Sequence, residues 1–495
     1  MPSTESSGSL GESTELLTPG RRSRMSGSSK VSVAMLLVMK LCGNMYENQM
    51  ATFDVKAFNQ TAANAGICVY EKQTPTSMLN IVVIAMAIAA LCLPTLGGLL
   101  SDAFLGCLKT LWIGVGLQLC GSAMLTAFDS AGLVCRMPMY LLAWVPVLLF
   151  LGFSDSLTLY APMQIATSSR TRQLLLCLYF FAAATGETIG NVPSMLKYFT
   201  ERSYEYLCVI FAVCSFLCLT VLTLQSEDAV LRHENVENFV MPRRKRLIKF
   251  YLIAAGTIPH LASITMCRVT LYWYQIRIFT HAYGDKDVLA YFIPLGGYQT
   301  ATISLSLVGA AAIYKLGAPG WASLMTRIRA GLCLMTASKV PLMLLSLLDF
   351  HQVISMESWS SATVWTVYFV SAFCDGVTNV LTTMAIYEMI YRIADAGAKA
   401  TMVGIFYTVW GLAIFLNGAI LLALQFCNVL HLDLHDRMKP KSHYAYGCVI
   451  CLLLIEIAYW EKISWPLASG LLSDHEAEEA EGQDGPQLCS FAGRD

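Results

Sequence analysis

The sequence predicts an all-α membrane protein of twelve transmembrane helices, and both its composition and its pattern point to this fold class. Hydrophobic residues make up 56% of the 495 residues, charged residues make up only 14%, and the mean hydropathy is +0.55. Soluble domains carry far more charge than this. The apolar residues stand in runs of about 20, a length with which an α-helix crosses the hydrocarbon layer. A helix also satisfies its own backbone hydrogen bonds in lipid.

The apolar runs lie between two polar tails. Residues 1–31 are rich in Ser, Gly and Thr and lack the apolar core of a signal peptide, so we expect a disordered cytosolic tail. The acidic segment 473–495 is predicted to be a second one. In chain order, the predicted helices are 32–53, 77–100, 108–128, 137–161, 173–195, 205–225, 248–280, 289–315, 328–350, 361–392, 400–427 and 444–471.

The longest polar interruption between these runs divides the predicted helices into two groups of six. We therefore expect an amino-terminal bundle over 32–225, a basic cytosolic linker over 226–247 and a carboxy-terminal bundle over 248–472. If both termini are cytosolic, the cytosolic segments carry about twice as many Lys and Arg as the opposite loops, as the positive-inside rule requires. The predicted topology places both termini in the cytosol.

Several charged residues interrupt the predicted helices. A charge at the bilayer centre costs several kcal/mol unless it faces a cavity or a partner, so each is a candidate site residue. The predicted substrate-cavity residues of this kind are Lys40, Asp155, Glu187, Arg277 and Glu388. Lys339 and Asp375 are further intramembrane charges, whereas Arg268 and Glu456 are expected to reach a membrane surface from helix ends.

Arg277 stands close to Trp273, Tyr274 and Gln275 in the seventh predicted helix. The planar guanidinium group matches the geometry of a carboxylate, so Arg277 is the preferred candidate for holding a substrate carboxylate. In the fifth predicted helix, Gly186 and Gly190 have the spacing of a close helix contact, and Glu187 between them is a candidate cavity residue.

The loop between the second and third predicted helices, residues 97–110, reads GGLLSDAFLGCLKT. Gly98 and Gly106 would let the backbone pass close to a neighbouring helix, and Asp102 could meet a helix N-terminus or a cation across the interface of the two halves. Lys109 would supply the cation. We interpret these four residues as gating residues, the alternative being an ordinary tight turn.

This loop and the six-plus-six layout resemble the major facilitator transporters, which carry a signature in the same place. Further stretches resemble the proton-dependent oligopeptide transporter family, nearest to its peptide/histidine branch. They are EMIY at 388–391, GIFY at 404–407 with Gly411, WYQ at 273–275, and YFF at 179–181 with Gly186. The resemblance implies proton-driven movement of di- and tripeptides or histidine, without a cofactor.

Several positions depart from that family's pattern. The acidic residues and arginine of its first helix are replaced by the stretch KLCGN at 40–44, and its helix 4 lysine falls at Ser154. The substrate-contacting asparagine of helix 5 falls at Ala184, and the glutamate of helix 10 falls at Asn379. Proton coupling is therefore in doubt. Lys40 and Asp155 could restore the link between helices 1 and 4 with their charges exchanged.

Sites outside the helices concern targeting and modification. Glu12, Leu16 and Leu17 have the acidic dileucine spacing read by clathrin adaptors, and the resembling transporters carry such signals and reside in endolysosomal membranes. The plasma membrane is the alternative location. Asn59 begins a glycosylation sequon in the first non-cytosolic loop. His431, His435 and His443 stand in one short segment with two aspartates, but a solvated loop is the preferred interpretation over a metal site.

The sequence contains no hydrolase elbow, phosphate-binding glycine loop or zinc-protease helix, so we do not expect an enzyme. The net charge of −1 gives no reason to expect nucleic acid as a partner. The expected partners are the bilayer, a small peptide or amino acid, and protons if coupling survives. The alternative is a transporter-shaped scaffold that moves no substrate and docks a cytosolic protein.

Overall fold

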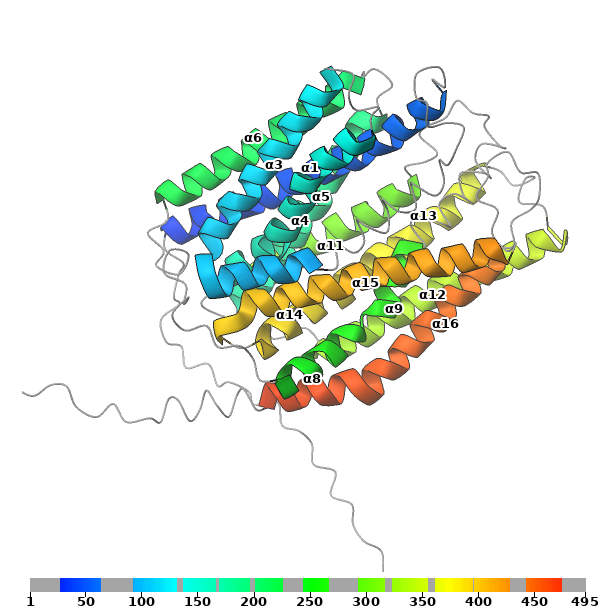
Figure 1. The fold of residues 1–495 in the computed structure, drawn as a ribbon. Helices are drawn as coiled ribbons and strands as arrows, with labels where there is room; N and C mark the ends of the chain where they lie inside the picture. The colour runs from blue at the N-terminus through cyan, green and yellow to red at the C-terminus, as the bar shows by residue number, and fades with distance from the viewer. Residues whose placement is uncertain are drawn as a thin grey trace, which may run out of the picture.

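The computed structural model describes residues 27–63, 92–130, 137–165, 169–195, 201–225, 244–266, 293–316, 323–354, 361–394, 396–427 and 442–473. All regular secondary structure within these ranges is helical, and the helices form one bundle (Figure 1). Eight helices in the described ranges are long and apolar enough to cross a membrane. The predicted all-α membrane fold is confirmed.

The first six predicted helices correspond to helices of the amino-terminal half, although 77–91 lies outside the described residues. The structure has α1 (Gly27–Ala63), an apolar helix Cys92–Leu105 that ends in the π-helix η2 (Ser101–Leu105), α3 (Cys107–Ser130), α4 (Met137–Ile165), α5 (Ser169–Met195) and α6 (Glu201–Gln225). α1 runs ten residues beyond the predicted end because residues 54–63 contain neither Gly nor Pro to stop it.

The carboxy-terminal half contains helices with interruptions that periodicity did not predict. Its elements are α8 (Arg244–Ala255), α9 (Ile258–Met266), α11 (Ile293–Leu316), α12 (Leu324–Phe350), α13 (Ser361–Thr378), η7 (Asn379–Thr383), α14 (Met384–Ile393), η8 (Ala396–Ala398), α15 (Lys399–Phe426), α16 (Ser442–Tyr459) and η9 (Trp460–Ser464). A turn at Gly256 and Thr257 separates α8 from α9. η7 and η9 are π-helical turns, which occur frequently at functional sites.

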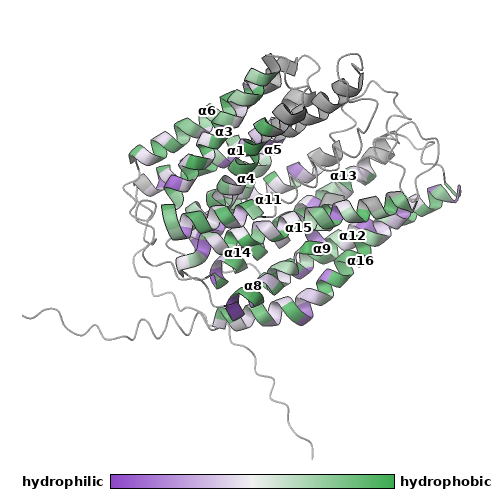
Figure 2. Cartoon of the chain, in the orientation of Figure 1, coloured by the Kyte–Doolittle hydropathy of each residue, from purple (hydrophilic) through white to green (hydrophobic). Residues whose placement is uncertain are grey.

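The two halves lie side by side. α3 and α6 form one side of the bundle, and α8, α9 and α16 form the other (Figure 1). Between them, α5 packs along α11, and the helix Cys92–Leu105 packs against α15. Large apolar side chains such as Leu217, Val308 and Leu454 are exposed, as expected of surfaces that face lipid. Hydrophobic residues cover most of the helix length, whereas the start of α8 is hydrophilic (Figure 2).

Glycines allow close contact between the halves at one place. A Cβ atom at Gly98 would overlap the carbonyl oxygen of Ala400, and one at Gly404 would overlap the carbonyl oxygen of Pro94. The hydroxyl groups of Thr95 and Thr408 share a hydrogen bond of 2.5 Å across the same contact. The helix Cys92–Leu105 and the first turns of α15 therefore touch backbone to backbone.

Candidate functional site

Polar contacts between the two halves gather at one end of the bundle. At this end α5, α12 and α15 begin, and α4, α11 and α14 end. We call it the basic end, because cationic side chains of both halves lie there. They are Arg170, Arg172, Arg327, Arg392 and Lys399.

Asp102 links the halves directly. Its Oδ2 atom accepts a hydrogen bond of 2.7 Å from the backbone N–H of Thr401 and one of 2.8 Å from the Thr401 hydroxyl. Thr401 lies in the first turn of α15, where backbone N–H groups have no partner within the helix. A carboxylate is stabilised there by the positive end of the helix dipole. Asp102 of the amino-terminal half thus caps a helix of the carboxy-terminal half.

The other predicted gating residues have different roles in the structure. Gly98 makes the close backbone contact that was expected of it. The expectation for Gly106 was wrong: a Cβ atom there would meet nothing within 4 Å, and its φ of 78° shows that the residue is needed to reverse the chain between η2 and α3. The expectation for Lys109 was wrong too. It is exposed on α3, and Thr401 supplies the donors to Asp102.

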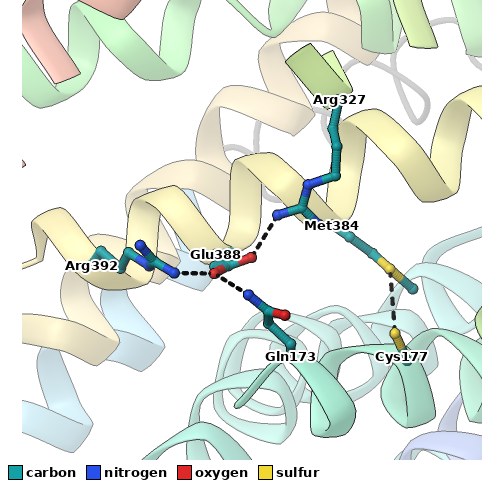
Figure 3. A network of polar contacts seen from close by, with 6 residues as sticks. All are labelled: Gln173, Cys177, Arg327, Met384, Glu388 and Arg392. Carbon is teal, nitrogen blue, oxygen red and sulfur yellow. Dashed lines mark hydrogen bonds and ion pairs between the residues drawn. The ribbon is translucent and has the colours of Figure 1, made fainter. Parts of the chain in front are cut away.

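Glu388 of α14 is the centre of a second contact at the basic end (Figure 3). Its Oε2 atom accepts from Arg327 of α12 at 2.8 Å, and its Oε1 atom accepts from Gln173 of α5 at 2.9 Å. Arg392, one turn further along the chain, also donates to Oε1. Glu388 is only 4% exposed, so these partners offset the cost of its burial. The Gln173 bond joins this network to the other half.

Two further contacts close the basic end. Arg170 at the start of α5 donates to the carbonyl oxygens of Ile313 and Tyr314 in α11, both at 2.9 Å. The Tyr391 hydroxyl of α14 donates to the carbonyl oxygen of Met163 in α4 at 3.2 Å. Each pair has one partner in each half of the chain. At this end the halves are therefore held by polar contacts to helix ends and to backbone.

A cavity of about 20 Å³ lies beside Glu388, at the contact between α5 and the helices of the other half. Cys177 and Met384 line it, and their sulfur atoms are 4.0 Å apart across the interface (Figure 3). A space of this size holds about one water molecule. No small peptide could pass here without separation of the two halves.

Lys40 lies beside Tyr179, which belongs to a group of aromatic side chains from both halves. Its Nζ atom is 5.6 Å from the centre of the Tyr179 ring, a cation–π arrangement. The hydroxyl groups of Tyr179 and Tyr407 lie 3.3 Å apart, and the Tyr407 ring stacks on Trp410 with 6.0 Å between ring centres. Lys40 is buried. α1, α5 and α15 thus bring a cation and three aromatic rings together.

Asn379 occupies a polar site in η7. Its amide nitrogen donates to the Tyr298 hydroxyl at 2.6 Å, and its amide oxygen accepts from Thr383 at 2.6 Å. The next residue of α11, Gln299, accepts from Thr188 of α5 at 2.5 Å. The fold therefore places buried hydrogen-bonding groups beside the α5–α11 contact, away from the basic end and on the carboxy-terminal side of the interface.

The remaining intramembrane charges are distributed as follows. Lys339 is buried and donates to Asp375 at 2.6 Å and to Ser371 at 2.9 Å, within the carboxy-terminal half. Glu187 is half-buried on α5, in the turn where a Cβ atom at Gly186 would overlap the carbonyl oxygen of Leu41. Asp155 lies in α4, but its side chain is outside the described residues.

Other predicted sites lie partly or wholly outside the described residues. Those wholly outside are Glu12, Leu16, Leu17, Arg268, Trp273, Tyr274, Gln275, Arg277, His431 and His435. Asn59 belongs to the last turns of α1, not to a loop, and its side chain is not described. His443 lies in the first turn of α16, where its ring centre is 5.1 Å from that of Phe350.

The expectation for Glu456 was wrong. It does not extend to a membrane surface but is fully buried inside the protein on α16, where it accepts a hydrogen bond of 3.3 Å from Trp460. The residue lies near the middle of the twelfth predicted helix, where a carboxylate side chain is too short to reach either surface.

Sequence reasoning missed Arg327, Gln173 and Thr401. The predicted ninth helix begins at 328, one residue after Arg327, which places that side chain in a loop. Ser323 is the signal for an earlier start, because serine is a favoured N-cap residue and its hydroxyl accepts from the backbone N–H of Thr326 in the structure. Gln173 and Thr401 carry no charge, and no pattern along the chain pairs them with residues more than 200 positions away.

Neither a known family's sequence profile nor a curated protein matches the chain. Solved structures of transporters do match it. A double-Trp mutant of XylE aligns with a TM-score of 0.62 at 14% identity, covering 88% of this chain and 96% of that one. The major facilitator transporter FucP in its outward conformation and the human organic anion transporter MFSD10 each align with a TM-score of 0.56 at 12% identity, covering 87% of this chain and 99% of theirs. The chain therefore has the major facilitator fold.

Proposed function

We propose that this chain is a secondary transporter that moves a small peptide or amino acid across a membrane by alternating access. The contact of Asp102 with the first turn of α15 carries the proposal, because it joins the two halves by hydrogen bonds to a helix end. These bonds can break when the halves separate, while both helices stay folded. The Glu388 and Arg170 contacts at the same end support it. Transporters built from two such bundles rock one half against the other.

The basic end is proposed to face the cytosol. Its concentration of Lys and Arg agrees with the positive-inside rule, and the tails that flank α1 and η9 would then both be cytosolic. The structure would accordingly represent the state closed toward the cytosol.

The proposed substrate carries a carboxylate and an apolar or aromatic side chain. Lys40 offers a cation to the carboxylate, and the rings of Tyr179, Tyr407 and Trp410 offer apolar surface beside it. Asn379, in place of the family's glutamate, supplies a neutral partner for an amino group. Peptides and amino acids, histidine included, have these groups. Proton coupling through the first helix is not part of the proposal, because that helix lacks the family's charges.

Uptake by purified protein in proteoliposomes tests this function. A labelled dipeptide and its carboxyl-terminal amide would be compared, with and without a pH gradient. We expect the dipeptide to be taken up faster than the amide, and Lys40→Gln to remove that preference. Lys315→Gln, at an exposed lysine of α11, is the matched control.

Absence of uptake by folded protein for peptides, amino acids and other small acids would contradict the proposal. That result would favour the transport-inactive scaffold that docks a cytosolic partner, for which the departures in the first helix are the supporting observation.

A further inference from the structure

Glu456 lies in an enclosed polar site that the proposed transport pathway does not use. It is 0% exposed and stands in the last turn of α16, which precedes the π-helical turn η9. Its Oε1 atom accepts a hydrogen bond of 3.3 Å from Trp460 Nε1. Its Oε2 atom has no hydrogen-bond partner among the described residues.

The helices packed against Glu456 contain further buried polar groups without partners. His260 of α9 is 0% exposed, and neither of its ring nitrogens forms a hydrogen bond within the described part of the chain. The hydroxyl groups of Ser263 on α9 and Ser464 on η9 are likewise buried and without partners there. These three side chains therefore keep hydrogen-bonding capacity, as donors and as acceptors, that no described residue uses.

The break between α8 and α9 lies beside η9. Gly256 and Thr257 form the turn, and a Cβ atom at Gly256 would overlap the Ser464 hydroxyl. The backbone N–H of His260, in the first turn of α9, interacts with the Glu456 carboxyl group. The turn between α8 and α9 thus packs against η9, and the first turn of α9 packs against Glu456.

No described cation balances Glu456. On α12, which packs against α16, Lys339 is paired with Asp375 and Arg329 is paired with Glu461. The cations of α8 all stand in its first two turns and are Arg244, Lys245, Arg246 and Lys249, and Lys462 is the cation of η9. α15 has no charged residue beyond Lys399 at its start, and His260 is the titratable group of α9. A buried carboxylate without a cationic partner costs several kcal/mol, and protonation removes that cost.

We propose that the site between α9 and α16 binds a single proton and that Glu456 is its acceptor. Protonation removes the charge that no described cation balances, and it gives Oε2 a hydrogen that an unpartnered nitrogen of the His260 ring can accept. Release returns the proton to water and leaves a carboxylate, so it requires α9 and α16 to separate. This proposal does not depend on the proposed transport function, because it describes the protonation of Glu456 in the protein without substrate.

Infrared spectroscopy of the purified full-length protein tests the proposal through the carbonyl-stretching band of protonated carboxylic acids. At neutral pH we expect the wild type to show an intensity in this band that Glu456→Gln removes. Glu461→Gln is the matched control, because Glu461 is exposed and lies five residues further along the same helix. An unchanged band in Glu456→Gln would overturn the proposal.

Thermal unfolding against pH provides a second measurement. Gln resembles the protonated acid in shape and charge, so Glu456→Gln should melt at the same temperature as the wild type near pH 4, where the glutamate of the unfolded chain is largely protonated too. At higher pH the unfolded wild type releases this proton while the folded protein keeps it, so the wild type should lose stability relative to the variant and melt below it at neutral pH. A Glu456→Gln protein that is unfolded or strongly destabilised at neutral pH would show that the fold needs the ionised form, and would equally overturn the proposal.

Discussion

The two carboxylates at the basic end, those of Asp102 and Glu388, differ in their hydrogen-bonding partners. Asp102 is held by the N–H and hydroxyl groups of Thr401, whereas Glu388 is held by Arg327, Arg392 and Gln173. A helix-end contact contributes about 1 kcal/mol, whereas breaking a buried ion pair costs about 3–5 kcal/mol. The Asp102 contact can therefore break and re-form with conformation at small cost. The Glu388 network contributes mainly to the stability of the carboxy-terminal half.

Asp102→Asn is expected to slow transport while leaving protein abundance unchanged. The amide oxygen can still accept from Thr401, so the substitution removes the charge at the helix N-terminus without removing the cap. The balance between the two states should shift by about 1 kcal/mol, or roughly fivefold. Uptake rates normalised to protein amount check this, with Lys109→Gln on the exposed face of α3 as control. Unchanged turnover would remove the gating role.

Glu388→Gln is expected to destabilise the protein by about 3 kcal/mol, because Arg327 keeps its charge in a largely buried position. Glu461→Gln is the control, since its pairing with Arg329 at 3.1 Å is exposed and should contribute less than about 1 kcal/mol. Thermal unfolding of both variants in detergent provides the comparison. An equal decrease in the melting temperature of both variants would show that the Glu388 network does not stabilise the fold.

At the scale of elements, apolar run length predicted the position of most helices but not their interruptions. Lipid-facing helices must be apolar and about 20 residues long, so their approximate bounds follow from composition. The turn at Gly256 and the π-helical turns η7 and η9 depend on packing against other helices, which a single run does not reveal. Asp102 and Gly98 could be identified because they belong to a local loop pattern. Arg327, Gln173 and Thr401 could not, because their roles depend on packing between distant helices.

The contact of the helix Cys92–Leu105 with α15 makes a prediction of its own. Gly404→Val is expected to hold the basic end open, because a side chain there overlaps the backbone of Pro94. Gly418→Val on the same helix is the matched control, since a Cβ atom at that position meets nothing within 4 Å. Thiol labelling of Cys177 from the basic end should accelerate in Gly404→Val and not in the control. Equal labelling rates would contradict this closure.

At the scale of the whole molecule, the major facilitator fold accounts for the two packed bundles, and the amino-terminal tail is proposed to determine their location. Glu12, Leu16 and Leu17 form the proposed adaptor signal for endolysosomal sorting. Replacing both leucines with alanine should move the protein to the plasma membrane, whereas Leu10→Ala in the same tail should not. Fluorescence microscopy against lysosomal markers measures this. Continued lysosomal residence of the double variant would show that the signal is unused.

The most direct test of alternating access uses the sulfur atoms of Cys177 and Met384, which lie 4.0 Å apart across the two halves at the basic end (Figure 3). In Met384→Cys, a short bifunctional thiol reagent should join the new cysteine to Cys177 and hold this end closed. The same variant with Cys177→Ala is the control for reaction at other cysteines. The account predicts that cross-linking abolishes uptake and that cleaving the cross-link restores it. Full uptake by fully cross-linked protein would contradict the claim that the halves must separate here.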